Sequence, residues 1–95
     1  MRVEIRLLDL HGLGLHAAID AFRCAYNEAL ASIWPAPIKV VHGYGSTGQG
    51  GIIIWKLRDI LQEHRRLGLL AFECGEDIDR KYTSLGYTIV YPHSL

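Results

Sequence analysis

Three residues with proton-transfer chemistry stand at the ends of two apolar segments: Asp9, His11 and His42. One residue separates Asp9 from His11, and each of the two histidines is followed by a glycine. A histidine exchanges protons near neutral pH, and a carboxylate beside it can fix its tautomer and raise its pKa. The three residues therefore form a candidate acid–base centre. The Asp-X-His spacing is equally typical of a turn cap, because both residue types tolerate unusual backbone geometry.

A glycine-dense loop over residues 43–51 follows His42 and precedes a predicted helix. The unpaired N–H groups and the positive dipole end of a helix N-terminus favour a phosphate, so this loop is a candidate anion cradle. Residues 43–48 also match GxGxxG, although that dinucleotide pattern normally follows the first strand of a larger fold. A Walker A site is excluded, because Gln49 and Gly50 stand where its lysine and its magnesium-binding hydroxyl are needed.

Hydrophobic periodicity predicts the elements that must position these residues. Alternation marks strands, and apolar residues at three- and four-residue steps mark helices. The predicted strands cover about 3–10, 38–42, 69–74 and 87–91, and the predicted helices about 15–33 and 52–66, with a polar connection over 75–85. This order, β-α-β-α-β-β, predicts a single domain over residues 1–95. Because charges interrupt one side of the strands, we expect an α/β two-layer sandwich, with a small four-stranded mixed sheet and two helices on one face.

The predicted pleat brings the candidate residues together. Strand side chains alternate between faces, so Asp9 and His11 share a predicted face with Leu7, and His42 shares one with Val40. The apolar members of each set should face the helices. A right-handed crossover makes the first two strands parallel, so their carboxyl ends meet at one edge beside the helix N-termini. We therefore expect the two histidines and the carboxylate to converge with the glycine loop there.

The composition limits the classes of function. Ten basic side chains balance ten acidic ones in the 95 residues, so there is no strong positive field for unspecific coating of DNA. Cys24 and Cys74 lie far apart without a CxxC pattern, which argues against a disulfide framework or a thiolate zinc site and favours reduced thiols. No apolar run approaches the ~20 residues that span a bilayer, and the charged N-terminus is not typical of a signal peptide. We expect a cytoplasmic protein with no membrane partner.

Two motifs resemble those of a known family. The sequence LDLHG at residues 8–12 is similar to the signature of the Smr (small MutS-related) domain, and residues 41–51 are similar to that family's HGxG loop in its longer glycine-rich variant. The helical spacing between the motifs also agrees, and the resemblance extends from the first strand to Tyr91. It implies a two-layer α/β sandwich with a small mixed sheet, and a role in binding or cleaving nucleic acid.

The resemblance implies an endonuclease that cleaves RNA or nicks DNA. The family's Asp and His correspond to Asp9 and His11, and its loop residues correspond to His42, Gly43, Tyr44 and Gly45. On RNA, His11 would take a proton from a 2′-hydroxyl, Asp9 would orient its ring, and His42 would protonate the leaving oxygen. No metal is required, because the sequence lacks the carboxylate cluster of a two-metal nuclease, although Asp9 with one histidine could hold a single Mg²⁺.

Further contacts with substrate are expected along the glycine loop and the second predicted helix. The loop candidates are Gly43, Tyr44, Gly45, Ser46 and Gly48. Tyr44 replaces a residue that is often basic in the family, which removes one phosphate partner. On the second helix, Trp55 and Arg58 lie opposite the apolar stripe, so a base could stack on Trp55 and a phosphate could meet Arg58. Packing of Trp55 under the 75–85 segment is the alternative for this side chain.

Two other functions fit the same residues. A non-catalytic module would bind nucleic acid at the loop without histidine chemistry, and, more distantly, a nucleotide-binding protein would use the GxGxxG pattern. Small residues on the outer side of the first helix, including Ala17, Ala21 and Cys24, also predict a weak homodimer. A ribosome or a repair assembly stays open as a larger partner.

Overall fold

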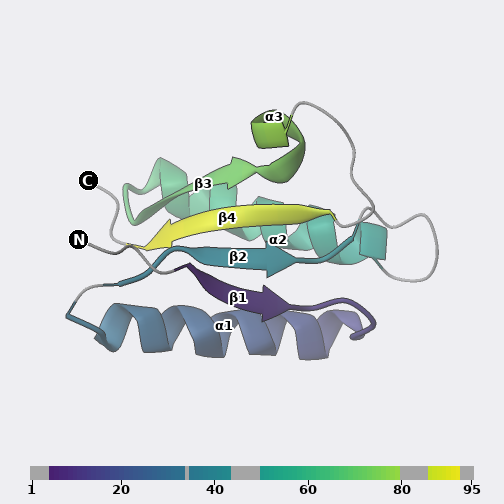
Figure 1. Cartoon of the computed structure of the whole chain (residues 1–95), viewed down its shortest axis with the longest axis horizontal. Helices are drawn as coiled ribbons and strands as arrows, with labels where there is room; N and C mark the ends of the chain where they lie inside the picture. The colour runs from purple at the N-terminus through teal and green to yellow at the C-terminus, as the bar shows by residue number, and fades with distance from the viewer. Residues whose placement is uncertain (1–4, 34, 44–49, 80–85, 93–95) are drawn as a thin grey trace.

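The structure is a computed structural model. It describes residues 5–33, 35–43, 50–79 and 86–92. Within these ranges the elements follow in the order β1-α1-β2-α2-β3-α3-β4 (Figure 1). The strands are β1 (Arg6–Asp9), β2 (Ile38–Val41), β3 (Leu70–Cys74) and β4 (Tyr87–Pro92), and the helices are α1 (Leu15–Ala31), α2 (Gly50–Arg66) and α3 (Gly75–Asp79).

The strands form one mixed sheet in the order β1-β2-β4-β3. β1 and β2 are parallel, as the crossover through α1 predicts, and β4 is antiparallel to both of its neighbours. The carboxyl ends of β1 and β2 lie side by side, with Asp9 paired to Val41 (Figure 1). We call this region, residues 9–13 and 41–43, the motif end, because the two sequence motifs meet there.

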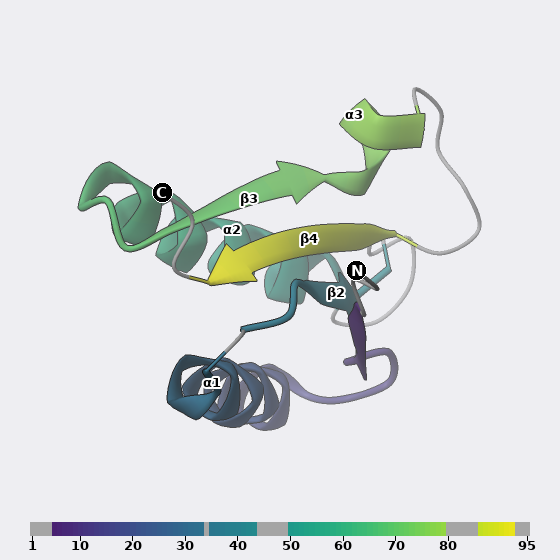
Figure 2. The same cartoon turned by 60° about the vertical axis from the view of Figure 1, so that its left-hand side comes forward.

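Helices α1 and α2 pack against one face of the sheet and against each other (Figure 2). One buried cluster joins them to the strands, with its members Leu10, Ala18, Phe22, Ala29, Ile38, Val40, Ile53, Leu57, Leu61, Leu70, Phe72 and Val90. The apolar stripes of both helices supply this cluster, so burial against the sheet stabilises each helix beyond its intrinsic propensity. The predicted small α/β architecture, with a four-stranded mixed sheet and two long helices, is confirmed.

A short helix interrupts the connection between β3 and β4. The sequence predicts only a polar connection over 75–85, whereas residues Gly75–Asp79 form α3, and residues 80–85 lie outside the described part of the chain. Gly75 packs so closely on Tyr87 that a Cβ atom would lie 2.7 Å from the Tyr87 ring and from its carbonyl oxygen. The missing side chain therefore allows α3 to turn back over β4.

The pleat of β1 is opposite to the predicted one. The prediction places Leu7 on the helix face, but Leu7 is 65% exposed while Leu10 is fully buried. Leu8 packs against the core, and Arg6 on the same side of the strand pairs with Glu28 of α1 at 2.7 Å. Leucines occupy both phases of this edge strand, so alternation alone does not fix its orientation. Burial of Leu8 and Leu10 fixes it in the folded chain.

Candidate functional site

The candidate site lies at the motif end, where two strands finish in similar turns. A backbone hydrogen bond of 2.7 Å from the N–H of Leu10 to the carbonyl of Val41 extends the pairing beyond β1. Gly12 and Gly43 have φ angles of +83° and +76°, in the left-handed region that favours glycine. The chain therefore turns sharply after each histidine, and both turns are held at the same end of the sheet.

Asp9 and His11 form one of these turns at the surface. The Oδ1 atom of Asp9 accepts a hydrogen bond of 2.9 Å from the backbone N–H of His11, and both side chains are exposed. This is the turn cap that the sequence leaves open as an alternative. The carboxylate holds the backbone of His11, and among the described residues no hydrogen bond joins it to the imidazole ring. The ring of His11 is accordingly accessible to a substrate.

His42 is buried, with 1% of its surface exposed. Its Nδ1 lies 2.7 Å from the carbonyl oxygen of Gly43, and its Nε2 lies 2.8 Å from the hydroxyl oxygen of Thr88. Because a carbonyl oxygen only accepts, Nδ1 carries a proton and donates it to Gly43. In the neutral ring, Nε2 accepts from the hydroxyl of Thr88. Both ring nitrogens are engaged inside the protein, so His42 is not placed to protonate a substrate oxygen.

Arg58 of α2 extends this network. Its Nε and Nη2 both lie 3.3 Å from the hydroxyl oxygen of Thr88, to which they donate. The hydroxyl thus accepts from Arg58 and donates to His42, which links α2 through β4 to the start of the glycine loop. The sequence predicts that Arg58 meets a substrate phosphate, whereas its guanidinium here contacts the hydroxyl that supports His42.

Thr88 is the site residue that the sequence analysis missed. It is fully buried in β4 and pairs with Val40 in the ladder, so it lies on the helix face of the sheet. A buried hydroxyl needs a hydrogen-bond partner. The one threonine within the run 87–90 is the signal that could have identified it, but the identity of its partner depends on the register between β2 and β4.

The three predicted acid–base residues do not form one centre. Asp9 pairs with Val41 in the parallel ladder, and paired residues project to the same face of the sheet. His42 follows Val41 and turns to the opposite face, where it meets Thr88. The predicted orientation is therefore right for His42 and wrong for Asp9, because β1 buries the alternate residues. The motif end brings together the backbones of the two turns, with the carboxylate and the buried imidazole on different faces.

Trp55 lies on the outer side of α2 and is 75% exposed, as its place opposite the apolar stripe predicts. It lines a hollow of about 460 Å³ between α2, β3 and α3. The described charged side chains that line this hollow are Arg58, Asp59, Arg65, Glu73 and Asp77. Among these described residues, three carboxylates stand beside two arginines.

Most of the predicted loop contacts fall outside the described residues. Tyr44, Gly45, Ser46 and Gly48 lie within 44–49, so their contacts with substrate stay predictions. Gly43 is described, and its backbone N–H donates to the carbonyl of Gly86 at 3.0 Å. That N–H is therefore used inside the protein. Helix α2 begins at Gly50, two residues earlier than predicted and within the predicted loop 43–51.

The part of the chain that the structure describes contains no group of three His, Cys, Asp or Glu side chains that could hold a metal ion. An ion at the motif end would therefore depend on Asp9 with one histidine. Neither Cys24, which is exposed, nor Cys74, which is half-buried, is part of a disulfide. Within the same ranges, the helices are too short or too polar to cross a membrane.

Comparison with models of known families, with curated proteins and with solved structures finds no match for this chain.

Proposed function

We propose that this chain is a nucleic-acid endonuclease of the Smr type, which acts at the motif end with Asp9 and His11. The observation that carries the proposal is the exposed turn formed by these two residues, which the parallel pairing of β1 and β2 holds beside the start of the glycine loop. The same turn and loop contain the two motifs that resemble the Smr domain. An imidazole with a fixed backbone and an exposed ring can take a proton from a bound substrate.

On RNA, the imidazole of His11 removes the proton of a 2′-hydroxyl, and the 2′-oxygen attacks the adjacent phosphorus. The bond from phosphorus to the 5′-oxygen breaks, and water protonates that oxygen, because His42 is buried. The products are a 2′,3′-cyclic phosphate and a 5′-hydroxyl. A positioned acid or base is typically worth about 10²–10⁴-fold, so we expect turnover to be slow without a second one.

Three other residues assist without taking part in proton transfer. Asp9 positions His11 by accepting from its backbone N–H. His42 positions the start of the glycine loop through the carbonyl of Gly43, and the loop N–H groups beyond Gly43 would hold the phosphate. The exposed ring of Trp55 offers a stacking surface that is worth about 1–3 kcal/mol for each base.

A non-catalytic nucleic-acid-binding module is the second candidate, and a specific observation favours it. Both ring nitrogens of His42 are bonded, and the carboxylate of Asp9 is committed to its turn. Only His11 then remains as an exposed proton carrier at the motif end. A module of this kind would keep the loop and the stacking surface and would release its ligand unchanged.

Labelled RNA and supercoiled plasmid separate these two functions. Each substrate is incubated with wild type, His11→Ala and the control His64→Gln, with EDTA or with Mg²⁺. His64 is a suitable control because it lies near the C-terminus of α2, whereas the motif end adjoins the N-terminus of that helix. Binding of the same RNA is measured in parallel by fluorescence anisotropy.

The endonuclease proposal expects cyclic phosphate ends from wild type and from His64→Gln in EDTA. It expects a loss of at least about 10²-fold in His11→Ala, with binding retained. Binding by all three proteins without cleavage selects the non-catalytic module. Cleavage at the full rate by His11→Ala overturns the assignment of the site. Cleavage that occurs only with Mg²⁺ overturns the metal-free route.

A further inference from the structure

A cavity lies between the two long helices. This groove of about 620 Å³ runs between α1, α2 and the turn after α2, and we call it the helix groove. Its apolar wall consists of Ile19, Phe22, Tyr26, Leu30, Ile60 and Leu69. The volume falls within the ~300–1,000 Å³ of typical small-molecule sites. Most of the residues that line it lie in the C-terminal halves of α1 and α2 or directly after α2. The groove is therefore away from the motif end, which adjoins the N-termini of both helices.

Three polar side chains also line the helix groove: Arg23 and Asn27 from α1, and His64 from α2. Arg23 and Asn27 are four residues apart, so they lie side by side on the same face of the helix. Within the described ranges, neither side chain has a hydrogen bond or an ion pair. No acidic residue is among the described residues that line the groove. The groove therefore combines an apolar wall with positive charge and unused donors.

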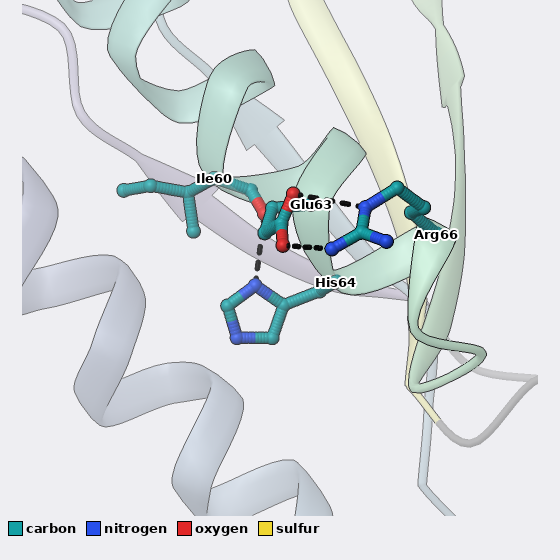
Figure 3. Close-up of polar contacts among 4 residues, drawn as sticks. All are labelled: Ile60, Glu63, His64 and Arg66. Carbon is teal, nitrogen blue, oxygen red and sulfur yellow. Dashed lines mark hydrogen bonds and ion pairs between the residues drawn. The ribbon is translucent and has the colours of Figure 1, made fainter.

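The ring of His64 extends from α2 toward α1 (Figure 3). Its Nδ1 donates to the carbonyl of Ile60 at 2.8 Å, so in the neutral ring Nε2 is an acceptor. Glu63, the neighbouring residue, points instead to Arg66, which donates to both carboxylate oxygens (Figure 3). These hydrogen bonds lower the pKa of Glu63. The carboxylate of Glu63 thus points away from the ring of His64.

A bridge between the helices limits the length of the helix groove. The hydroxyl of Tyr26 donates to the carbonyl of Leu69 at 3.4 Å, which connects α1 to the turn after α2. Burial raises the pKa of Tyr26, so the hydroxyl stays protonated and can donate. The bridge crosses the groove between α1 and the turn after α2, and Asn27 and Leu30 line the groove on the C-terminal side of Tyr26. It therefore suits a compact ligand better than a helix of a partner protein, which would run past this point.

We infer that the helix groove binds a small apolar carboxylic acid. Its aromatic or aliphatic body lies against Phe22 and Leu30, and its carboxylate lies between the guanidinium of Arg23 and the side-chain NH₂ of Asn27. The charge of Arg23, which forms no ion pair with a described residue, selects the anion over a neutral molecule of the same shape. This site is independent of the proposed nuclease, since it shares no residue with the motif end.

The test uses the whole chain labelled with ¹⁵N and titrated with 2-naphthoate or with the neutral 2-naphthamide, a probe of the same shape. Backbone amide shifts identify the binding site and give the dissociation constant. Arg23→Gln removes the cation from the groove. Arg66→Gln is the matched control, because it makes the same change at an exposed arginine whose partner, Glu63, lies outside the groove.

We expect 2-naphthoate to shift the amides of residues that line the helix groove and to bind about fivefold or more tightly than 2-naphthamide. Arg23→Gln should remove this preference, a loss of about fivefold for the naphthoate alone, and Arg66→Gln should keep it. Equal binding of the two probes, equal effects of the two substitutions, or shifts elsewhere in the chain would each overturn the inference. Groove amides that move with protein concentration alone would also overturn it, since a second copy would then fill the groove.

Discussion

A His-Gly dipeptide follows each of the two neighbouring parallel strands, yet one histidine is at the surface and the other is inside the protein. Both glycines, Gly12 and Gly43, have φ angles near +80° in the left-handed region, at +83° and +76°. His11 follows β1, an edge strand, while His42 follows β2, which lies between β1 and β4. The dipeptide sets the turn in both cases. The position of the strand in the sheet decides whether the imidazole meets solvent or Thr88.

This difference separates two uses of the same side chain. A histidine with an exposed ring can change its protonation state during a reaction. A histidine with both ring nitrogens bonded in the interior fixes the geometry around it, since changing its protonation state would leave a buried donor or acceptor unsatisfied. The motif end therefore offers one reactive imidazole, at His11, and one structural imidazole, at His42.

The largest effect should come from removing the buried imidazole. We expect His42→Ala to lower the free energy of unfolding by about 2–4 kcal/mol, because it leaves a cavity and removes the partner of Thr88. His11→Ala, at the exposed step, should change it by less than about 0.5 kcal/mol. Urea unfolding followed by circular dichroism measures both values. Equal losses of unfolding free energy in the two variants would contradict the distinction between a buried His42 and an exposed His11.

The element pattern and the parallel pairing of β1 and β2 follow from the sequence, because helix stripes and the crossover rule are local and general. Which face of β1 is buried does not follow from the sequence, since Leu7 and Leu8 place a leucine on each face of the strand. Only packing against the helices determines that Leu8 is the buried one. The helix α3 is also absent from the prediction, because it is short and polar and depends on the contact between Gly75 and Tyr87. The ends of the strands that carry the candidate residues therefore follow from the sequence, while the faces of those residues follow only in part.

The hydroxyl of Thr88 gives a sharper test of how the buried imidazole of His42 is held. Thr88→Val keeps the shape of the side chain and removes the hydroxyl that contacts His42 and Arg58. We expect a loss of about 1–2 kcal/mol, because Nε2 of His42 is left buried without its partner. Thr88→Ser, which keeps the hydroxyl, is the control and should lose less. A valine variant as stable as wild type would show that this hydroxyl does not support His42.

The two glycines should respond alike, in contrast to their histidines. Gly12→Ala and Gly43→Ala each force an L-residue into a left-handed conformation, at about 1 kcal/mol. A Cβ atom at either position meets nothing within 4 Å, so the cost is that of the backbone alone. Losses that match within about 0.5 kcal/mol, measured by urea unfolding, would support a common turn. A much larger loss at Gly43 would mean that the loop beyond it adds its own constraint.

The smallest effect should come from substitution of Asp9. Two substitutions of this residue separate the role of its hydrogen bond to His11 from the role of its charge. Asp9→Asn keeps an oxygen that accepts from the N–H of His11, so stability should change by only about 0.3 kcal/mol, while Asp9→Ala removes the acceptor and should lose about 0.5–1 kcal/mol. If Asp9 acts through this hydrogen bond, RNA cleavage in EDTA should persist in Asp9→Asn and fall in Asp9→Ala. Cleavage lost equally in both variants would show that the negative charge is needed to act on the imidazole. Because the two variants share the loss of charge and differ in the carboxamide that carries the acceptor oxygen, the ratio of their rates measures what the turn itself contributes.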